Sequence, residues 1–133
     1  NMNLARGVPA PQAAAYLEAI PATSRSAVLK EKLGDLYSSL GKPASAIRSW
    51  RQALELNPSP QQDIRLRLTL AEHLARAEER EEALAAYESL LQKHPRYPGA
   101  IEVYQRMIPL AVALGRTDEV KHYEQEIATR RQQ

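Results

Sequence analysis

The sequence repeats itself at a spacing of 37 residues, and this period constrains the fold more than any other feature. Five positions of the first copy are matched 37 residues later by residues of similar character: Leu33, Gly34, Ala46, Trp50 and Pro58 by Leu70, Ala71, Ala83, Tyr87 and Pro95. A further step of 37 carries the slot of Gly41 through Glu78 to Gly115. Self-similarity at such a period indicates stacked structural units, each of which buries its apolar face against its neighbours.

Each copy contains two apolar patterns at helical spacing, joined by a short polar turn. In the first copy, Leu29, Leu33, Leu36 and Leu40 recur three or four positions apart. The same test along the chain predicts a first helix in each unit at about 24–40, 60–77 and 98–114, and a second at about 43–56, 80–93 and 117–131. A short helix at about 11–19 precedes them, in register with the second helices.

Local signals agree with these limits. Pro43 and Pro60 suit the first turn of a helix, where a backbone N–H is not needed. Ser59 can act as the N-cap of the helix predicted at 60–77. Gly41 and Gly115 supply the permissive backbone between paired helices. The chain therefore reads as half a unit followed by three helical hairpins.

Residue size within the first hairpin indicates how its helices meet. Gly34, Ala46 and Ala53 are small, as expected where two antiparallel helices cross closely. Tyr37 and Trp50 are the large side chains that fill the space beside the crossing. We expect these residues to be structural.

This ordered pattern resembles the tetratricopeptide repeat. The slots of that family are filled in the first unit by Leu33, Gly34, Tyr37, Gly41, Ala46, Trp50, Ala53 and Pro58, and in the second by Leu70, Ala71, Ala83, Tyr87 and Pro95. Lys30 stands where the family has an early Trp, and the third unit keeps Gly115 but little else. The resemblance covers about 27–131.

The resemblance implies an all-α fold, a right-handed superhelical array of antiparallel helical hairpins, or α-solenoid. It implies an N-terminal segment at 1–23 holding a half repeat, and a repeat domain at 24–133. The repeats of that domain are expected at about 24–60, 61–97 and 98–133.

Pro109 is the one residue that conflicts with its predicted helix, 98–114. Inside a helix, proline removes a backbone donor and crowds the preceding turn. A kink is therefore expected at this position, either tolerated by a degenerate last repeat or used to widen the groove.

Composition and charge limit the kinds of partner that are expected for this chain. Eighteen Lys and Arg against sixteen Asp and Glu leave a formal charge of +2, and the basic residues form no stripe, so no nucleic-acid partner is expected. No apolar run approaches the roughly 20 residues of a membrane span. The absence of cysteine leaves the compartment open. We expect a soluble protein, cytoplasmic or bacterial periplasmic, without membrane insertion.

No motif in the sequence indicates catalysis. The three histidines, His73, His94 and His122, lack metal-ligand spacing. The five glycines are isolated, so there is no phosphate-binding loop. We therefore expect no enzyme activity, no catalytic residues, no cofactor and no metal.

The resemblance implies a protein-interaction module, an adaptor or scaffold that binds a peptide or partner helix in a concave groove lined by the first helices. The matching positions are Val28, Glu31, Asp35, Arg65, Leu68, Glu72, Glu102 and Gln105. Most of the charged ones are acidic. They are expected to repel acidic chaperone tails and to favour a partner that carries Lys or Arg.

Two alternatives stay open. The array could self-associate as a structural element, with Tyr16, Leu17 and Ile20 at the end of the half repeat stacking on another copy. It could also be a docking or regulatory segment of a larger enzyme. Concentration-dependent sedimentation separates a groove-binding module from a self-associating array.

Overall fold

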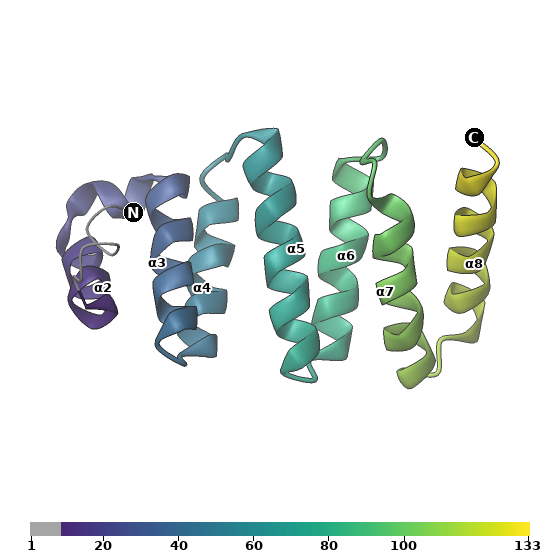
Figure 1. Ribbon diagram of the computed structural model, residues 1–133, viewed down its shortest axis with the longest axis horizontal. Helices are drawn as coiled ribbons and strands as arrows, with labels where there is room; N and C mark the ends of the chain where they lie inside the picture. The colour runs from purple at the N-terminus through teal and green to yellow at the C-terminus, as the bar shows by residue number, and fades with distance from the viewer. Residues whose placement is uncertain (1–8) are drawn as a thin grey trace. The chain divides into compact units, whose positions relative to one another are not determined.

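The computed structural model describes residues 9–133, and in this part of the chain every regular element is a helix. The elements are α2 (Ala10–Ala19), the 3-10 helix η1 (Pro21–Arg25), α3 (Ala27–Ser39), α4 (Pro43–Leu54), α5 (Pro60–Arg76), α6 (Arg80–Lys93), α7 (Ala100–Ala113) and α8 (Thr117–Arg131) (Figure 1). Residues 1–8 of the predicted N-terminal segment lie outside the described residues.

The described part of the chain forms two compact units, which divide between Leu66 and Arg67. In the first unit, α3 packs along α4 as an antiparallel hairpin, and α2 and η1 pack on α3. In the second unit, α7 pairs with α8, and α6 packs on α7. The predicted all-α architecture of helical hairpins, the α-solenoid class, is therefore confirmed.

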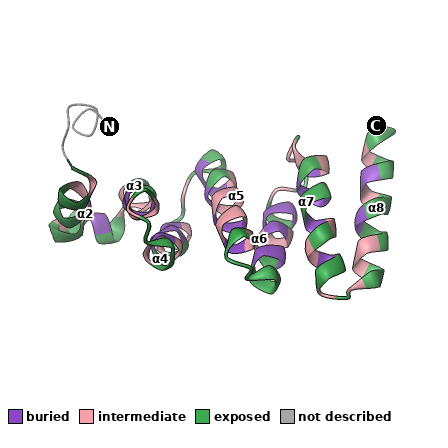
Figure 2. Cartoon of the chain, turned by 60° about the horizontal axis from the view of Figure 1, so that its bottom comes forward, coloured by how far each residue is buried: buried purple, intermediate pink, exposed green. Residues whose placement is uncertain are grey.

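The helices of the first unit have buried residues on one side and exposed residues on the opposite side, as the purple and green of Figure 2 show. Ala46, Trp50 and Ala53 of α4 form a core with Leu66 of α5. Ala14 of α2 forms a second cluster with residues of α3. The period of three and four in the apolar residues places these side chains on the faces that meet.

The second unit has a larger buried set. Its apolar side chains at 2% exposure or less are Leu74, Ala71, Ala83, Leu84, Tyr87, Leu90, Ala100, Val103, Met107 and Ala111. At the α7–α8 contact, the rings of Tyr104 and Tyr123 lie 5.7 Å apart, and the Arg130 guanidinium lies 5.4 Å from the Tyr104 ring centre. The cation thus covers an aromatic face at the end of the last hairpin.

The predicted helix limits hold within about three residues, and the largest shift is at the start of α3. That helix begins at Ala27 instead of residue 24, because Ser26 is its N-cap and accepts a hydrogen bond from the Leu29 N–H at 3.2 Å. The chain before it forms η1. Ser59 caps α5 as predicted, since its hydroxyl accepts from the Gln62 N–H at 3.2 Å.

The turns inside the three hairpins share one backbone geometry. Gly41, Glu78 and Gly115 have φ of 71°, 62° and 71°, in the left-handed region. The residue after each donates its N–H across the turn to a carbonyl five positions back: Lys42 to Tyr37, Glu79 to Leu74 and Arg116 to Ala111, each at 2.9 Å. This is the Schellman pattern of helix C-termini. The 37-residue period thus holds at the level of backbone hydrogen bonds.

Glu78 occupies a conformation that suits glycine, which yields a stability prediction. Glu78→Gly is expected to stabilise the chain by about 0.5–1 kcal/mol, because a left-handed φ strains any residue that carries a Cβ. Urea denaturation measures the change. Gly41→Ala is the matched control and is expected to destabilise the chain, because it places a Cβ on a residue with a left-handed φ. The added Cβ meets no atom within 4 Å, so backbone strain is the only change. A less stable Glu78→Gly protein would contradict the shared turn geometry.

Pro109 lies within α7, which continues as helix through Pro109 to Ala113. The proline is on the exposed side of the helix, whereas Met107 and Ala111 on either side of it are buried. The buried face of α7 therefore keeps its helical spacing past the proline.

Candidate functional site

The predicted lining residues of the first unit share one face of α3, which we call the α3 face: Val28, Glu31 and Asp35, with Arg65 contributed by α5. The three α3 residues are three and four positions apart, so they project in nearly the same direction. Val28 is 66% exposed, although it is apolar. Val28 is thus an exposed apolar side chain on a face whose other residues are charged.

Glu31 is held in an ion pair across α3 and α5. Arg65 donates through Nε to Oε2 and through Nη2 to Oε1, each at 2.7 Å. Gln62 adds a third donor, its Nε2 lying 3.0 Å from Oε1. The hydrogen bonding of Arg65 to Glu31 raises the pKa of the Arg65 guanidinium above its usual value. The Glu31 side chain is only 13% exposed and the Arg65 side chain 59%. The cation is therefore the more accessible partner.

Asp35 connects the α3 face to the core. Its Oδ1 accepts a hydrogen bond from Trp50 Nε1 at 3.2 Å. Partial burial raises the pKa of the Asp35 carboxyl, and the Trp50 hydrogen bond opposes that rise. Trp50 is 1% exposed, so Asp35 provides its indole N–H with an acceptor at the edge of the core.

Gly34 explains how the indole reaches Asp35. A Cβ built on Gly34 would lie 2.5 Å from Cδ1 and 2.9 Å from Cε2 of Trp50. The indole therefore rests directly on the backbone of α3, as predicted from the small residue at the crossing. This close approach needs a residue without a side chain.

The second unit has its own charged pair on the corresponding helices. Arg106 of α7 donates through Nη1 to Oε2 of Glu72 on α5 at 2.6 Å. The hydrogen bond to Glu72, followed by that to Tyr87, raises the pKa of Arg106. Among the other predicted lining residues of this unit, Leu68 is half-buried, and Glu102 and Gln105 are exposed.

The residues predicted to pack the repeats fall mostly in the core. Buried are Leu33, Gly34, Ala46, Trp50, Ala53, Ala71, Ala83 and Tyr87. Tyr37 and Pro58 are half-buried, and Pro95 is exposed.

The sequence did not predict three of these contacts. They are the hydrogen bond from Gln62 to Glu31, the ion pair of Arg106 with Glu72, and the hydrogen bond from Trp50 to Asp35. Glu31 and Arg65 are 34 residues apart, and so are Glu72 and Arg106, whereas the repeat spacing is 37. Positions that match at the repeat spacing of 37 are therefore not the positions that form these ion pairs. The spacing of 34 between opposite charges on successive first helices was the available signal.

Within residues 9–133, no group of three or more His, Cys, Asp or Glu side chains is arranged to hold a metal ion. Across the same residues, none of the helices has the length and apolar character needed to cross a bilayer.

Comparisons with known proteins identify one repeat and the fold. Residues 27–60 match the family model of the tetratricopeptide repeat. Two solved structures titled as crystal structures of MamA superpose on the chain with TM-scores of 0.71 and 0.68, at 21% and 22% identity. They cover 97% and 93% of this chain, which spans 72% and 64% of theirs. No curated relative matches the chain.

Proposed function

We propose that this chain, which carries a tetratricopeptide repeat at residues 27–60, is a non-catalytic protein-interaction module that binds an extended peptide or a partner helix on the α3 face. The observation that carries the proposal is the exposure of Val28, 66%, on the same face as the Glu31–Arg65 pair and Asp35. An apolar anchor supplies affinity, and the charges around it set orientation and register.

The proposed partner carries a basic side chain close to an apolar one. Glu31 and Glu72 are already paired with Arg65 and Arg106, so they offer less negative charge than their number suggests. The Trp50 hydrogen bond is made to Oδ1 of Asp35, and a carboxylate has further acceptor capacity that a Lys or Arg of the partner can use. The recognition of charge in this unit therefore centres on Asp35.

Asp35→Asn is expected to weaken binding of a basic amphipathic peptide about five- to tenfold in calorimetric titration. Asn keeps an oxygen that accepts from Trp50 but removes the charge that meets the cation, which is worth about 1 kcal/mol or slightly more at an exposed site. Val28→Ser is expected to weaken binding by a similar factor through lost apolar contact.

Glu79→Gln is the matched control for this titration, because Glu79 is an exposed glutamate of the α5–α6 turn and is not one of the residues of the α3 face. It is expected to leave the affinity unchanged. An acidic peptide of the same length is expected to bind weakly. The proposal is wrong if the acidic peptide binds tightly, or if both Asp35→Asn and Val28→Ser bind the basic peptide as the parent does.

Self-association is the second candidate function, and the exposed side of α2 favours it. Tyr16 is 68% exposed, and Pro11, Ala15 and Ala19 on the same helix are also exposed. A large aromatic surrounded by small apolar residues is suited to packing against another helix. Sedimentation of the parent and of Tyr16→Glu at several concentrations distinguishes the candidates, because only self-association gives a mass that rises with concentration and falls in the variant.

A further inference from the structure

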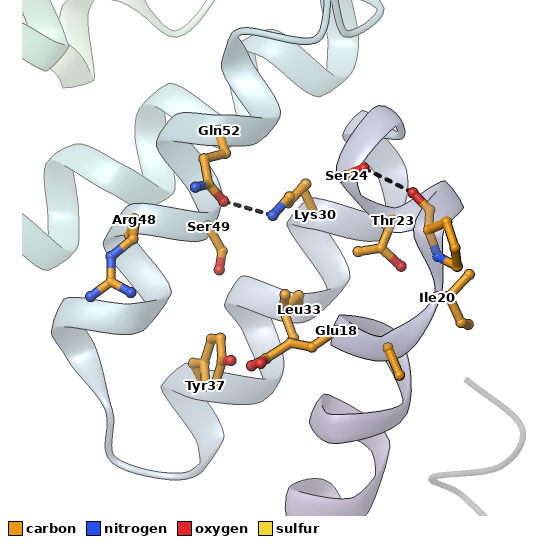
Figure 3. A pocket seen from close by; sticks show the side chains of 12 residues that line it. Glu18, Ile20, Thr23, Ser24, Lys30, Leu33, Tyr37, Arg48, Ser49 and Gln52 are labelled. Carbon is orange, nitrogen blue, oxygen red and sulfur yellow. Dashed lines mark hydrogen bonds between the residues drawn. The ribbon is translucent and has the colours of Figure 1, made fainter.

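A cavity of about 430 Å³ opens in the first unit between η1 and the α3–α4 hairpin, away from the residues of the α3 face. Figure 3 shows its lining side chains, which come from the end of α2, from η1, and from α3 and α4. The volume lies in the range of small-molecule sites, about 300–1,000 Å³. Lys30, whose slot holds Trp in the repeat pattern, lines the cavity and extends to Gln52.

One buried hydroxyl of the lining, that of Thr23, has no hydrogen-bond partner among residues 9–133. Thr23 is 3% exposed, and its Oγ1 is unpaired within that range. Ser49 is 4% exposed, and its hydroxyl points into the space between Leu33, Tyr37 and Arg48 (Figure 3). Buried polar groups are almost always paired, so the Thr23 hydroxyl indicates a missing hydrogen-bond partner at this cavity.

Most of the other polar side chains of the lining can donate hydrogen bonds. Lys30 Nζ donates to Gln52 Oε1 at 2.7 Å, which fixes the Gln52 amide with its NH₂ group available. The Tyr37 hydroxyl and the Arg48 guanidinium lie on the same lining. Among the described residues that line the cavity, Glu18 is the only carboxylate, against the two cations Lys30 and Arg48. The site is rich in donors, carries a net positive charge and holds few acceptors.

We propose that this cavity is a binding site for a carboxylate group. A carboxylate brings two acceptor oxygens and a negative charge, which match the hydroxyls of Thr23 and Ser49 and the charge of Lys30 and Arg48. The apolar side chains of Ile20, Pro21 and Leu33 contact the carbon skeleton of the ligand. Either a free small acid or the C-terminus of a peptide supplies this chemistry.

The test follows the amide resonances of the ¹⁵N-labelled chain during titration with succinate, with a tripeptide that has a free C-terminus, and with the same tripeptide as its C-terminal amide. Sodium chloride at matched ionic strength is the blank. Saturable shifts are expected for residues 23, 30, 49 and 52. Binding of succinate alone identifies a free acid, and binding of the free tripeptide but not its amide identifies a chain terminus.

Lys30→Met and Ser49→Ala are each expected to weaken the binding about tenfold, because each removes one donor with little change in shape. Arg48 is exposed, so Arg48→Gln removes a charge without disturbing the core and serves if either of the other variants fails to fold. Lys42→Met is the matched control, since Lys42 is an exposed lysine outside the cavity.

The proposal is overturned by shifts no larger than those in chloride, by shifts that grow without saturating for all three probes, or by equal affinity in the parent and in Arg48→Gln and Lys30→Met. A loss of affinity in Lys42→Met as large as that in Lys30→Met would also overturn it, because charge alone would then account for the binding.

Discussion

Gly34→Leu is expected to destabilise the first unit by about 3 kcal/mol or more. Even the first carbon of a new side chain would lie 2.5 Å from Cδ1 of Trp50, so the α3–α4 hairpin must open or the indole must leave its site. Urea denaturation, followed by circular dichroism, measures the loss.

The control for this variant is Glu79→Gln, an exposed change expected to alter the free energy of unfolding by less than about 0.5 kcal/mol. If Gly34→Leu unfolds at the same urea concentration as the parent protein, then α3 and α4 do not cross as described.

Trp50→Ala is expected to cost about 3–5 kcal/mol, the range for removing a large aromatic side chain from a core. Trp50 is 1% exposed and belongs to the cluster of Ala46, Ala53 and Leu66, so its removal leaves a cavity in the core of the first unit. Thermal denaturation and urea denaturation are both expected to show the loss.

Combining the two substitutions tests the contact itself. A leucine side chain introduced at position 34 would occupy part of the space that Trp50 vacates. The Gly34→Leu/Trp50→Ala double variant is therefore expected to lose clearly less stability than the sum of the two single losses. A coupling of about 1 kcal/mol or more is expected. Strict additivity would show that the indole does not rest on Gly34, whatever the single variants do.

The sequence predicted the helices, their pairing and the turns between them, because these depend on local spacing. Apolar residues three and four apart define a helix face, and small residues at matching offsets define a crossing. Glu78 is informative here, since glutamate gives no signal for a left-handed turn. The sequence analysis did not predict its left-handed φ, although the place of Glu78 in the 37-residue register, between Gly41 and Gly115, was the available signal.

The charged contacts could not be predicted in the same way. Whether Glu31 reaches Arg65 depends on how α3 and α5 are rotated about their axes, and side-chain spacing within one helix carries no such information. The cavity beside η1 was missed for a related reason. The sequence showed Lys30 at an aromatic slot, but not that the neighbouring segment leaves the space open.

The hydrogen bond between Trp50 and Asp35 has an optical consequence. Trp50 is the only tryptophan of the chain. Fluorescence excited at the long-wavelength end of tryptophan absorption therefore comes from this one residue. Its indole N–H is bonded to a carboxylate that lies on the proposed binding face. A cationic side chain of the partner that binds the Asp35 carboxylate changes the electric field at the indole. The wavelength of the Trp50 fluorescence emission is therefore expected to shift on binding. The chain thus carries its own fluorescent reporter for occupancy of that face, without any added label.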